Sequence, residues 1–398
     1  MRIAFVVGGF PRISETWILA QVTGLMDRGH EVDIYARRPS SETLIHEGVA
    51  AYNLLRRTYV YDLPTGRAAR AARAAGVLLR RLPRNPRAMI TCLDRRRFRS
   101  TYAVLNNVMF VEPFLDRHYD AVLCHFGGNG LDFVVLKDVF PRTRFVTMFH
   151  GDDCLIGDEK GAEAVAPLQR LGDAFLVTTD CFGRANLRRQ GFDDRRIVTL
   201  RLSFAAEKVP FRERRPAGRT LRLVSIGRLV ERKDFPTGIR AVAALKAARP
   251  DLDVEYAIIG DGPLRGDLTR LAQEEGVGTA VQLLGVQSDP ELQRRLHEAD
   301  IYLLPSLMEG AGYVLLEAQA SGLPVVATRV GGVPEMVREG RSAVLVEPRD
   351  VAGTRDALLW LLDHPERWPD MGHEGRRHVE EQHDADRLTT TLEAVLEG

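Results

Sequence analysis

Leu221-Arg-Leu-Val-Ser-Ile-Gly-Arg-Leu-Val-Glu-Arg-Lys233 joins a short apolar run to a glycine and a basic loop. Similar apolar runs recur along the chain and alternate with amphipathic stretches such as Leu264–Gln273 and Val351–Leu362. Runs that are buried on both faces are typical of parallel strands, because crossover helices cover both sides of the sheet. The other runs are Ile3–Val7, Val32–Tyr35, Ala121–Cys124, Phe145–Phe149, Phe175–Val177, Ile197–Leu200, Tyr256–Ile259, Val281–Leu284, Ile301–Leu304, Val325–Ala327 and Ala343–Val346. Two series of such repeats predict an α/β protein with two doubly wound, Rossmann-like domains that face each other across a cleft.

The predicted domain boundary lies in the stretch from Ser203 to Thr220, which lacks periodicity and contains two prolines. We therefore expect a first domain at residues 1–203 and a second at 204–380. The last helical pattern, about Ala385–Leu396, has no strand partner. Residues 381–398 are accordingly predicted to cross back toward the first domain.

The composition indicates a globular protein whose main partner is not nucleic acid. The chain has 398 residues, 45% of them hydrophobic, and its 55 basic and 54 acidic residues give a formal net charge of +1. A nucleic-acid-binding protein is expected to be strongly basic. Only five of the basic residues are lysines (Lys137, Lys160, Lys208, Lys233 and Lys246), so a lysine carries more information here than an arginine.

Cysteine spacing and hydropathy predict a reduced, cytoplasmic protein. The four cysteines form no C-x-x-C pair, which argues against a zinc site or a redox motif. No apolar run reaches the roughly 18 residues expected of a membrane span. The apolar stretch between Met1 and Pro11 is too short for a signal peptide.

Glycine and polar residues gather where the predicted strands end. Ligands of open α/β sheets bind at the carboxyl ends of the strands. The segments at these ends are Gly8-Gly9, His125-Phe-Gly-Gly128, His150-Gly-Asp-Asp153, Gly227-Arg228, Gly260-Asp-Gly262 and Ser306–Gly312. We therefore predict a ligand site in the cleft between the two domains.

The segment Glu309-Gly-Ala-Gly-Tyr-Val-Leu-Leu-Glu317 is the strongest functional signal. Its glycines allow close approach of the backbone to a ligand, and a helix that begins there would favour an anion such as phosphate. Eight residues of helix span roughly 12 Å, so the two carboxylates could hold opposite ends of a long ligand. Glu317 would accept from ribose hydroxyls and Glu309 from a sugar hydroxyl. The alternative is a helix-capping acid with an exposed glutamate.

Arg228 and Lys233 lie on the loop after a predicted strand and could bind a pyrophosphate. Each charge-assisted hydrogen bond contributes about 1.5–3 kcal/mol. The alternative is a solvated basic loop, but the scarcity of lysine favours a function for Lys233. His150 could donate to a sugar or phosphate or act in acid–base chemistry, and His125 has the same position after its own strand. Either histidine could instead be structural.

Taken together, these residues resemble the retaining glycosyltransferases of family 4, which have the GT-B fold. The resemblance is best over Leu221–Val346, where Gly-Arg-x4-Lys, Gly-Asp-Gly-Pro-Leu, Glu-x7-Glu, Ala-Ser-Gly-Leu-Pro-Val-Val-Ala and Gly-Gly-Val-Pro-Glu follow in order. Near the start, Phe10-Pro11-x2-Ser14-Glu15-Thr16 looks like the opening of bacterial exopolysaccharide transferases of the colanic-acid type.

The resemblance implies a role for each matching residue. Arg228 and Lys233 would hold the diphosphate of a UDP- or GDP-sugar, and Glu317 its ribose. The donor sugar would contact Glu309 and the backbone amides of Gly310, Ala311, Gly312 and Tyr313. Gly9 and the backbone near Val286 would complete the donor site, the latter against the base. His150 would line the reaction centre, and Glu15 and His125 would face a hydroxyl-bearing acceptor in the first domain. Ala311 stands where the family often has an aromatic residue, and Asp152 and Asp153 receive no role.

Charge accounts for the predicted mechanism. Cleavage of the anomeric bond puts negative charge on the departing diphosphate, which Arg228 and Lys233 could stabilise. The family resemblance implies retention by same-face attack, with the leaving phosphate oxygen taking the acceptor proton. No Asp-x-Asp pair ends a strand, since Asp251-Leu-Asp253 precedes one, so we predict a metal-independent enzyme without a cofactor.

The stretch Gly66–Ser100 contains eleven arginines and one acid, Asp94. Two interpretations remain open for it. It could contact the inner face of a membrane or an anionic lipid-diphosphate acceptor. It could instead be a solvated surface helix, which is slightly favoured because the prolines at positions 83 and 86 break the pattern and no large aromatic residue anchors it.

Three other classes of protein share part of this pattern. A dehydrogenase would need G-x-G-x-x-G after a strand, and Arg265 stands where the last glycine belongs after Gly260-Asp-Gly262. A nucleotide-sugar epimerase could share the two-domain architecture, and a binding protein could retain the fold without turnover. The intact Arg228, Lys233, Glu309 and Glu317 favour a transferase. Its expected acceptor is an exopolysaccharide repeat unit on a lipid carrier, with a small-molecule antibiotic as the alternative.

Overall fold

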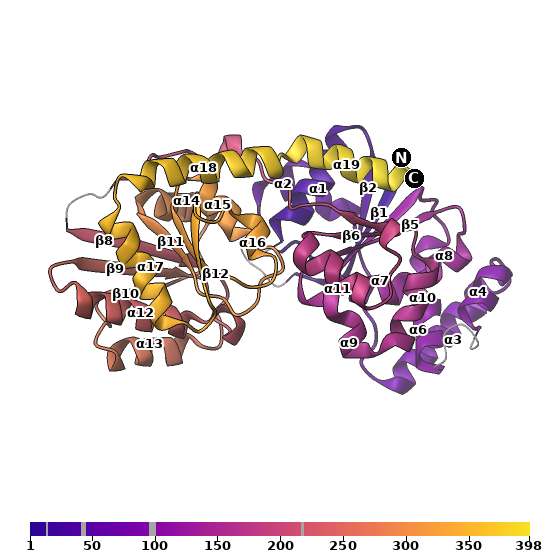
Figure 1. Cartoon of the computed structure of the whole chain (residues 1–398). Coiled ribbons are helices and arrows are strands. Elements are labelled where there is room, and N and C mark those ends of the chain that lie inside the picture. The colour runs from indigo at the N-terminus through magenta and orange to yellow at the C-terminus, as the bar shows by residue number, and fades with distance from the viewer. Residues whose placement is uncertain (13–14, 41–44, 95–100, 216–218) are drawn as a thin grey trace. The chain divides into compact units, whose positions relative to one another are not determined.

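A computed structural model describes residues 1–12, 15–40, 45–94, 101–215 and 219–398 (Figure 1). The chain divides into two compact units. The first unit comprises residues 1–203 together with 385–398, and the second comprises residues 204–384.

The first unit is built on a seven-stranded sheet with the order β3-β2-β1-β4-β5-β6-β7. Every neighbouring pair of these strands is parallel. The strands are β1 (Arg2–Phe10), β2 (Glu31–Pro39), β3 (Thr58–Val60), β4 (Ala121–His125), β5 (Arg144–Phe149), β6 (Ala174–Val177) and β7 (Ile197–Thr199). The helices are α1 (Thr16–Asp27), α2 (Glu47–Ala51), α3 (Arg67–Arg81), α4 (Pro86–Cys92), α6 (Thr101–Val111), α7 (Gly127–Phe133), α8 (Val135–Val139), α9 (Ile156–Lys160), α10 (Ala162–Leu171), α11 (Ala185–Arg189) and α19 (Ala385–Glu397).

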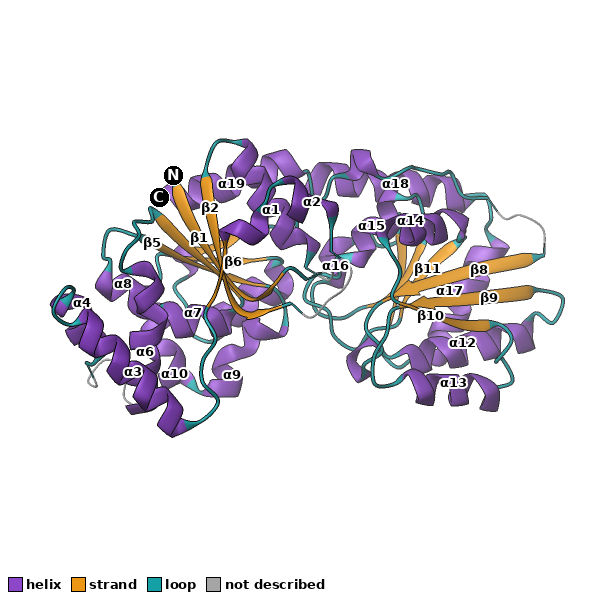
Figure 2. Ribbon diagram, turned by 180° about the vertical axis from the view of Figure 1, so that it is seen from behind, coloured by secondary structure: helices purple, strands orange, loops and turns teal. Residues whose placement is uncertain are grey.

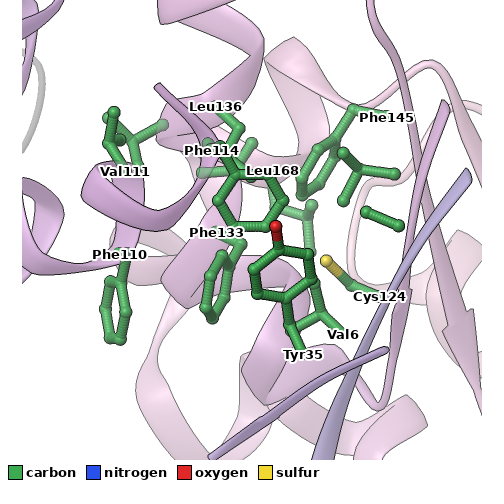
Figure 3. Close-up of a cluster of buried hydrophobic side chains, with 14 of the residues drawn as sticks. Val6, Tyr35, Phe110, Val111, Phe114, Cys124, Phe133, Leu136, Phe145 and Leu168 are labelled. Carbon is green, nitrogen blue, oxygen red and sulfur yellow. The ribbon is translucent and has the colours of Figure 1, made fainter. Parts of the chain in front are cut away.

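Side chains on both faces of this sheet are buried, as the apolar runs predict. Along β1, Ala4 and Val6 join the hydrophobic cluster on one face, and Ile3, Phe5 and Val7 join the cluster on the other. This alternation follows from the two-residue period of a strand. Figure 3 shows the first cluster, in which Val6 and Tyr35 from the sheet meet phenylalanines of the covering helices.

Helix α19 packs against α1 in the first unit. Leu392 and Leu396 of α19 are buried in the second of these clusters. At the surface, Glu393 accepts hydrogen bonds from Arg28 at 2.9 Å and pairs with His30 at 2.7 Å. The C-terminal helix is therefore held by apolar burial and by a charged seam along its edge.

The second unit is built on a six-stranded parallel sheet with the order β10-β9-β8-β11-β12-β13. Helices α12, α13 and α17 lie along one face, and α14, α15 and α18 lie along the other (Figures 1 and 2). The strands are β8 (Thr220–Ile226), β9 (Asp253–Ile259), β10 (Val281–Gly285), β11 (Ile301–Leu304), β12 (Val325–Thr328) and β13 (Ala343–Val346). The helices are α12 (Phe235–Ala248), α13 (Arg265–Glu274), α14 (Asp289–Glu298), α15 (Val314–Ala320), α16 (Val333–Met336), α17 (Val351–Asp363) and α18 (Arg367–Gln382).

The predicted fold class is confirmed, because both sheets are parallel and carry helices on both faces. Each predicted apolar run coincides with a strand. The strand that the sequence did not predict is β3, which has only three residues and is partly buried at the sheet edge. So short a run, without burial on both faces, carries no clear hydrophobic period.

Candidate functional site

Two loops of the second unit meet where β8 and β9 end. Gly260 adopts a φ of +134°, and a Cβ atom there would lie 2.0 Å from the carbonyl oxygen of Gly227. Only glycine permits this approach. The Leu229 amide donates to the carbonyl of Asp261 at 2.9 Å, which fixes the basic loop on its neighbour.

Lys233 and Glu309 form an ion pair between the loops that follow β8 and β11. The Lys233 Nζ lies 2.5 Å from Glu309 Oε1, and the two side chains are only 12% and 10% exposed. Ser306 donates its hydroxyl to the same carboxylate oxygen at 2.7 Å. The structure thus brings together, in one charged cluster, a residue predicted to bind the diphosphate and a residue predicted to bind the sugar.

The backbone around Glu309 is tightly held. The Gly332 amide donates to the carbonyl of Glu309 at 3.0 Å. Gly331 has a φ of +51°, and a Cβ atom there would lie 1.9 Å from the Glu309 carbonyl oxygen. A side chain at position 331 would therefore displace the loop that presents the carboxylate.

The segment from Glu309 to Glu317 is not one continuous helix. Helix α15 begins at Val314, so Glu309 lies in the preceding loop. The expectation that helical geometry sets the separation of the two carboxylates is therefore wrong. Burial raises the pKa of the Tyr302 hydroxyl well above its usual value, and the negative charges of Glu317 and Glu309 raise it further.

The remaining predicted donor residues differ in accessibility. Arg228 is exposed, and among the described residues it forms no ion pair. Val286, just after β10, is 55% exposed, whereas Ala311 is only 3% exposed. The Tyr313 ring lies 5.5 Å from that of Phe204 in an edge-to-face arrangement.

In the first unit, the last residue of β4, His125, is in direct contact with His150, which follows β5. Nδ1 of His125 lies 2.9 Å from Nε2 of His150. The aromatic rings of Phe126 and Trp17 lie 4.8 and 5.7 Å from the His150 ring. Burial lowers the pKa of His150 to about 3 and that of His125 well below its usual value, so both rings are neutral near pH 7.

Burial also decides what these two histidines can touch. His150 is half-buried at the strand end, whereas His125 is 0% exposed. Contact of His125 with an acceptor stays a prediction, and the burial of its ring favours an action through His150.

Asp153 ties the two histidine loops together. One of its carboxylate oxygens accepts from the amides of His150 and Gly151 at 2.9 and 2.8 Å. The other accepts from the amide of Gly127, just after β4, at 3.0 Å. The pKa of Asp153 is raised by burial, although the three amides favour its charged form. Sequence reasoning assigned this residue no role, because these contacts join loops far apart in the sequence.

Gly9, Arg12 and Glu15 cluster at the end of β1. A Cβ atom at Gly9 would lie 3.0 Å from Nε of Arg12. Arg12 donates to the Glu15 carboxylate, which is 11% exposed, at 3.3 Å. Ser14 of the predicted motif lies outside the described residues.

The described ranges lack a metal-binding cluster and a membrane-spanning helix. They contain no group of three or more His, Cys, Asp and Glu side chains arranged to hold a metal ion. They also contain no helix that is both long and apolar enough to span a membrane.

Solved structures of glycosyltransferases share this architecture. The chain aligns with HepE from Anabaena, solved in complex with UDP and glucose, at a TM-score of 0.72 and 15% identity, over 100% of this chain and 99% of that chain. It aligns with TarM at a TM-score of 0.72 and 13% identity, over 100% of this chain and 99% of that chain. At these identities the likeness shows the fold, and it confirms the expected GT-B architecture.

Comparison with sequences of known proteins identifies the family. Residues 220–364 match the family described as glycosyl transferases group 1. Over its length, the chain is 30% identical to the glycosyltransferase WcaL of Salmonella typhimurium, whose name assigns it provisionally to colanic acid biosynthesis (92% of each chain). It is also 30% identical to the amylovoran biosynthesis glycosyltransferase AmsK of Erwinia amylovora (91% of this chain and 90% of that protein). With both sheets, the charged strand-end cluster and full-length relatives in agreement, the chain belongs to the group 1 glycosyltransferases, in the branch that contains the colanic acid and amylovoran enzymes.

Proposed function

We propose that this protein is a retaining glycosyltransferase that moves a sugar from a UDP- or GDP-sugar to a hydroxyl group of a lipid-linked glycan in exopolysaccharide biosynthesis. The observation that carries the proposal is the buried Lys233–Glu309 pair in the part of the chain that matches the group 1 family. A cation and a carboxylate at one strand-end site suit a ligand that joins a phosphate to a sugar. The names of the full-length relatives support the pathway, and the nucleotide bound to HepE supports the donor class.

In the proposed donor complex, Arg228 and Lys233 bind the diphosphate in the second unit. The ammonium of Lys233 has three donors, so it can keep its contact with Glu309 and still donate to a phosphate oxygen. Glu309 and the amides of residues 310–313 bind the sugar, Glu317 binds the ribose, the backbone at Val286 faces the base, and Gly9 leaves room beside the donor. As the anomeric bond breaks, both cations stabilise the charge that develops on the leaving diphosphate.

The proposed stereochemistry is retention. No carboxylate of the site is assigned as a covalent nucleophile, so the acceptor hydroxyl attacks on the face that the diphosphate leaves. The departing phosphate oxygen then takes the proton of that hydroxyl, while His150 lines the reaction centre. Because Arg228 and Lys233 supply the positive charge, we propose that the reaction needs no metal ion. The first unit, with Glu15, binds the acceptor.

We propose that the enzyme acts in the cytoplasm, at the inner face of the membrane. Leu79 of α3 (82% exposed), Ile90 of α4 (64%) and Leu82 between the two helices (42%) lie at the surface in a stretch with many arginines. Apolar side chains beside guanidinium groups suit a surface of anionic lipids. This combination favours membrane contact over the solvated-helix interpretation for the described part of residues 66–100.

Vesicle flotation tests the membrane proposal. The wild-type protein should float with vesicles containing phosphatidylglycerol and stay in solution with vesicles of phosphatidylcholine alone. The double variant Leu79→Ser/Ile90→Ser keeps every arginine and should bind the anionic vesicles more weakly. Equal flotation of variant and wild type would show that the exposed apolar side chains take no part.

Nucleotide release from a panel of UDP- and GDP-sugars tests the proposed reaction. With a lipid-diphosphate-linked saccharide as acceptor, one donor should be consumed in the presence of EDTA. The coupling constant of the new anomeric proton in the NMR spectrum should show the configuration of the donor. Inversion would contradict the retaining mechanism, and conversion of the donor into another sugar nucleotide without transfer would identify an epimerase.

A further inference from the structure

The contact between His125 and His150 is an edge-to-edge hydrogen bond. The two imidazole planes differ by only 12°, and the ring centres are 5.2 Å apart while the nearest nitrogens are 2.9 Å apart. A separation so much larger between centres than between nitrogens means that the nitrogens lie between the two rings. An imidazole N–H lies in the plane of its ring, so this arrangement suits one shared proton.

Each ring has a second nitrogen for which the described protein supplies no partner. These atoms are Nε2 of His125 and Nδ1 of His150, and both are buried. Because both rings are neutral, each carries one proton, and the bridge contains one of the two. Either His150 donates from Nε2 and its Nδ1 keeps a lone pair, or His125 donates from Nδ1 and the proton of His150 is on Nδ1.

The surroundings of His125 distinguish these two arrangements. Its ring is fully buried, stacks on Phe5 at 5.4 Å, and lies where Asn129 holds its carbonyl oxygen at 2.8 Å. If His150 donated, the proton of His125 would be on Nε2, as an N–H that neither the described protein nor a ligand could satisfy. Orphaned buried N–H groups are rarer than under-satisfied acceptors. The second arrangement puts the unpartnered N–H on Nδ1 of His150. This atom is covered as well, but its residue is half-buried at the strand end, whereas His125 is 0% exposed.

We propose that His125 is a positioning residue that donates from Nδ1 to Nε2 of His150 and so holds His150 as the Nδ1–H tautomer. His150 then presents an N–H to an oxygen of the bound sugar donor, an identification that rests on the proposed function. In this state His150 has no free lone pair, so it acts as a hydrogen-bond donor and not as a general base. The choice that the sequence leaves open for His150 is thereby decided.

Two variants of equal shape isolate the hydrogen bond. His125→Asn places an amide nitrogen where Nδ1 lies and can still donate to His150. His125→Leu has the same branched outline without a donor. The tautomers are read from long-range proton–nitrogen NMR spectra of protein labelled with ¹⁵N-histidine, and the His150 signals are assigned by their loss in His150→Gln.

The wild-type spectrum should show His150 as the Nδ1–H tautomer, and His125→Asn should keep it. In His125→Leu, His150 should populate both tautomers. An Nε2–H tautomer in the wild type would overturn the proposal, and so would an unchanged tautomer in His125→Leu. If His125→Leu does not fold, the wild-type spectrum and His125→Asn still decide.

A comparison of kcat between the two variants is a second test. A purely structural role for His125 would not make the variant that keeps the hydrogen-bond donor more active than the one that lacks it. His125→Leu should lower kcat about tenfold, the effect of one well-aimed hydrogen bond, and His125→Asn should restore most of it. The affinity for UDP or GDP should be the same in all three proteins. The tautomer is observed without substrate, so a wild-type protein that transfers no sugar would contradict the proposed function and leave the spectra to judge the positioning role.

Discussion

Among the residues of the proposed donor site, Lys233 and Arg228 differ in their surroundings. Lys233 is nearly enclosed and paired with Glu309, whereas Arg228 is exposed. Removal of Arg228 should therefore leave folding almost unchanged, within about 0.5 kcal/mol. Removal of Lys233 leaves a buried carboxylate without its cation and should cost about 1–3 kcal/mol.

Both substitutions should lower turnover, and for Arg228→Ala the loss of turnover should far exceed the loss of stability. Arg228→Ala and Lys233→Ala each remove about 1.5–3 kcal/mol of stabilisation from the leaving diphosphate, or roughly 10–150-fold in kcat. Arg270→Ala, in an exposed ion pair on α13, is the matched control and should leave kcat unchanged. Near wild-type transfer by either variant would show that its residue does not bind the diphosphate.

The low pKa of His150 predicts an acid-dependent loss of stability. The folded protein holds this pKa at about 3, against the ordinary value of 6.5, because burial disfavours the charged ring. The fold therefore has its full stability above pH 6.5, where His150 is neutral in the unfolded chain as well. The stability falls as the pH drops toward 3, because the unfolded chain binds a proton that the folded protein excludes. Between pH 7 and pH 5 the loss is about 2 kcal/mol.

Urea unfolding of wild type and His150→Gln at both pH values measures this contribution. The variant lacks the titrating ring, so between pH 7 and pH 5 its unfolding free energy should fall by about 2 kcal/mol less than that of the wild type. Equal falls in both proteins would mean that His150 titrates normally when folded.

Sequence patterns located most residues of the candidate site but few of their contacts. The strand-end rule pointed to Lys233, Glu309 and both histidines, because the ends of parallel strands meet at one edge of a sheet. It could not show that Lys233 pairs with Glu309, or that Ser306 and Asp153 hold these loops in place. Such contacts depend on loop conformations, which the hydrophobic period of a sequence does not predict.

At the scale of elements, α19 shows how the end of the chain stabilises the first unit. Leu392 is fully buried between this helix and the sheet, and Glu393 lies on the partly exposed edge with Arg28 and His30. Leu392→Ala should cost about 2–5 kcal/mol, because it leaves a cavity. Glu393→Gln should cost about 1 kcal/mol or less, because its pairs are open to solvent.

Urea denaturation followed by circular dichroism compares the two α19 variants. A loss for Leu392→Ala no larger than that for Glu393→Gln would mean that the helix is held by its charged edge.

Strands were more predictable than loops in this protein. Runs such as Ile301–Leu304 are apolar throughout and buried on both faces, so their boundaries agree with the sequence pattern. The loop before α15 was expected to be helical from about Gly310, but the helix begins at Val314. Two glycines between Glu309 and Tyr313 oppose helix formation, and Gly312 adopts a φ of +66°.

At the scale of the whole molecule, the two units contribute different functional features. The family match lies in the second unit, with the Lys233–Glu309 pair. The first unit carries the paired histidines and the arginine-rich helix α3. Similarity to the colanic acid and amylovoran enzymes extends through both units, which favours a transferase over the epimerase and binding-protein alternatives. The cleft expected between the domains stays a prediction.

Calorimetric titration of UDP and GDP tests the central claim, a metal-independent nucleotide diphosphate site in the second unit. The wild-type protein in EDTA should bind one of the two nucleotides with micromolar affinity. Added magnesium should leave that affinity unchanged, and Arg228→Ala should weaken it at least tenfold. Binding of neither nucleotide, or binding that appears only with magnesium, would contradict the account.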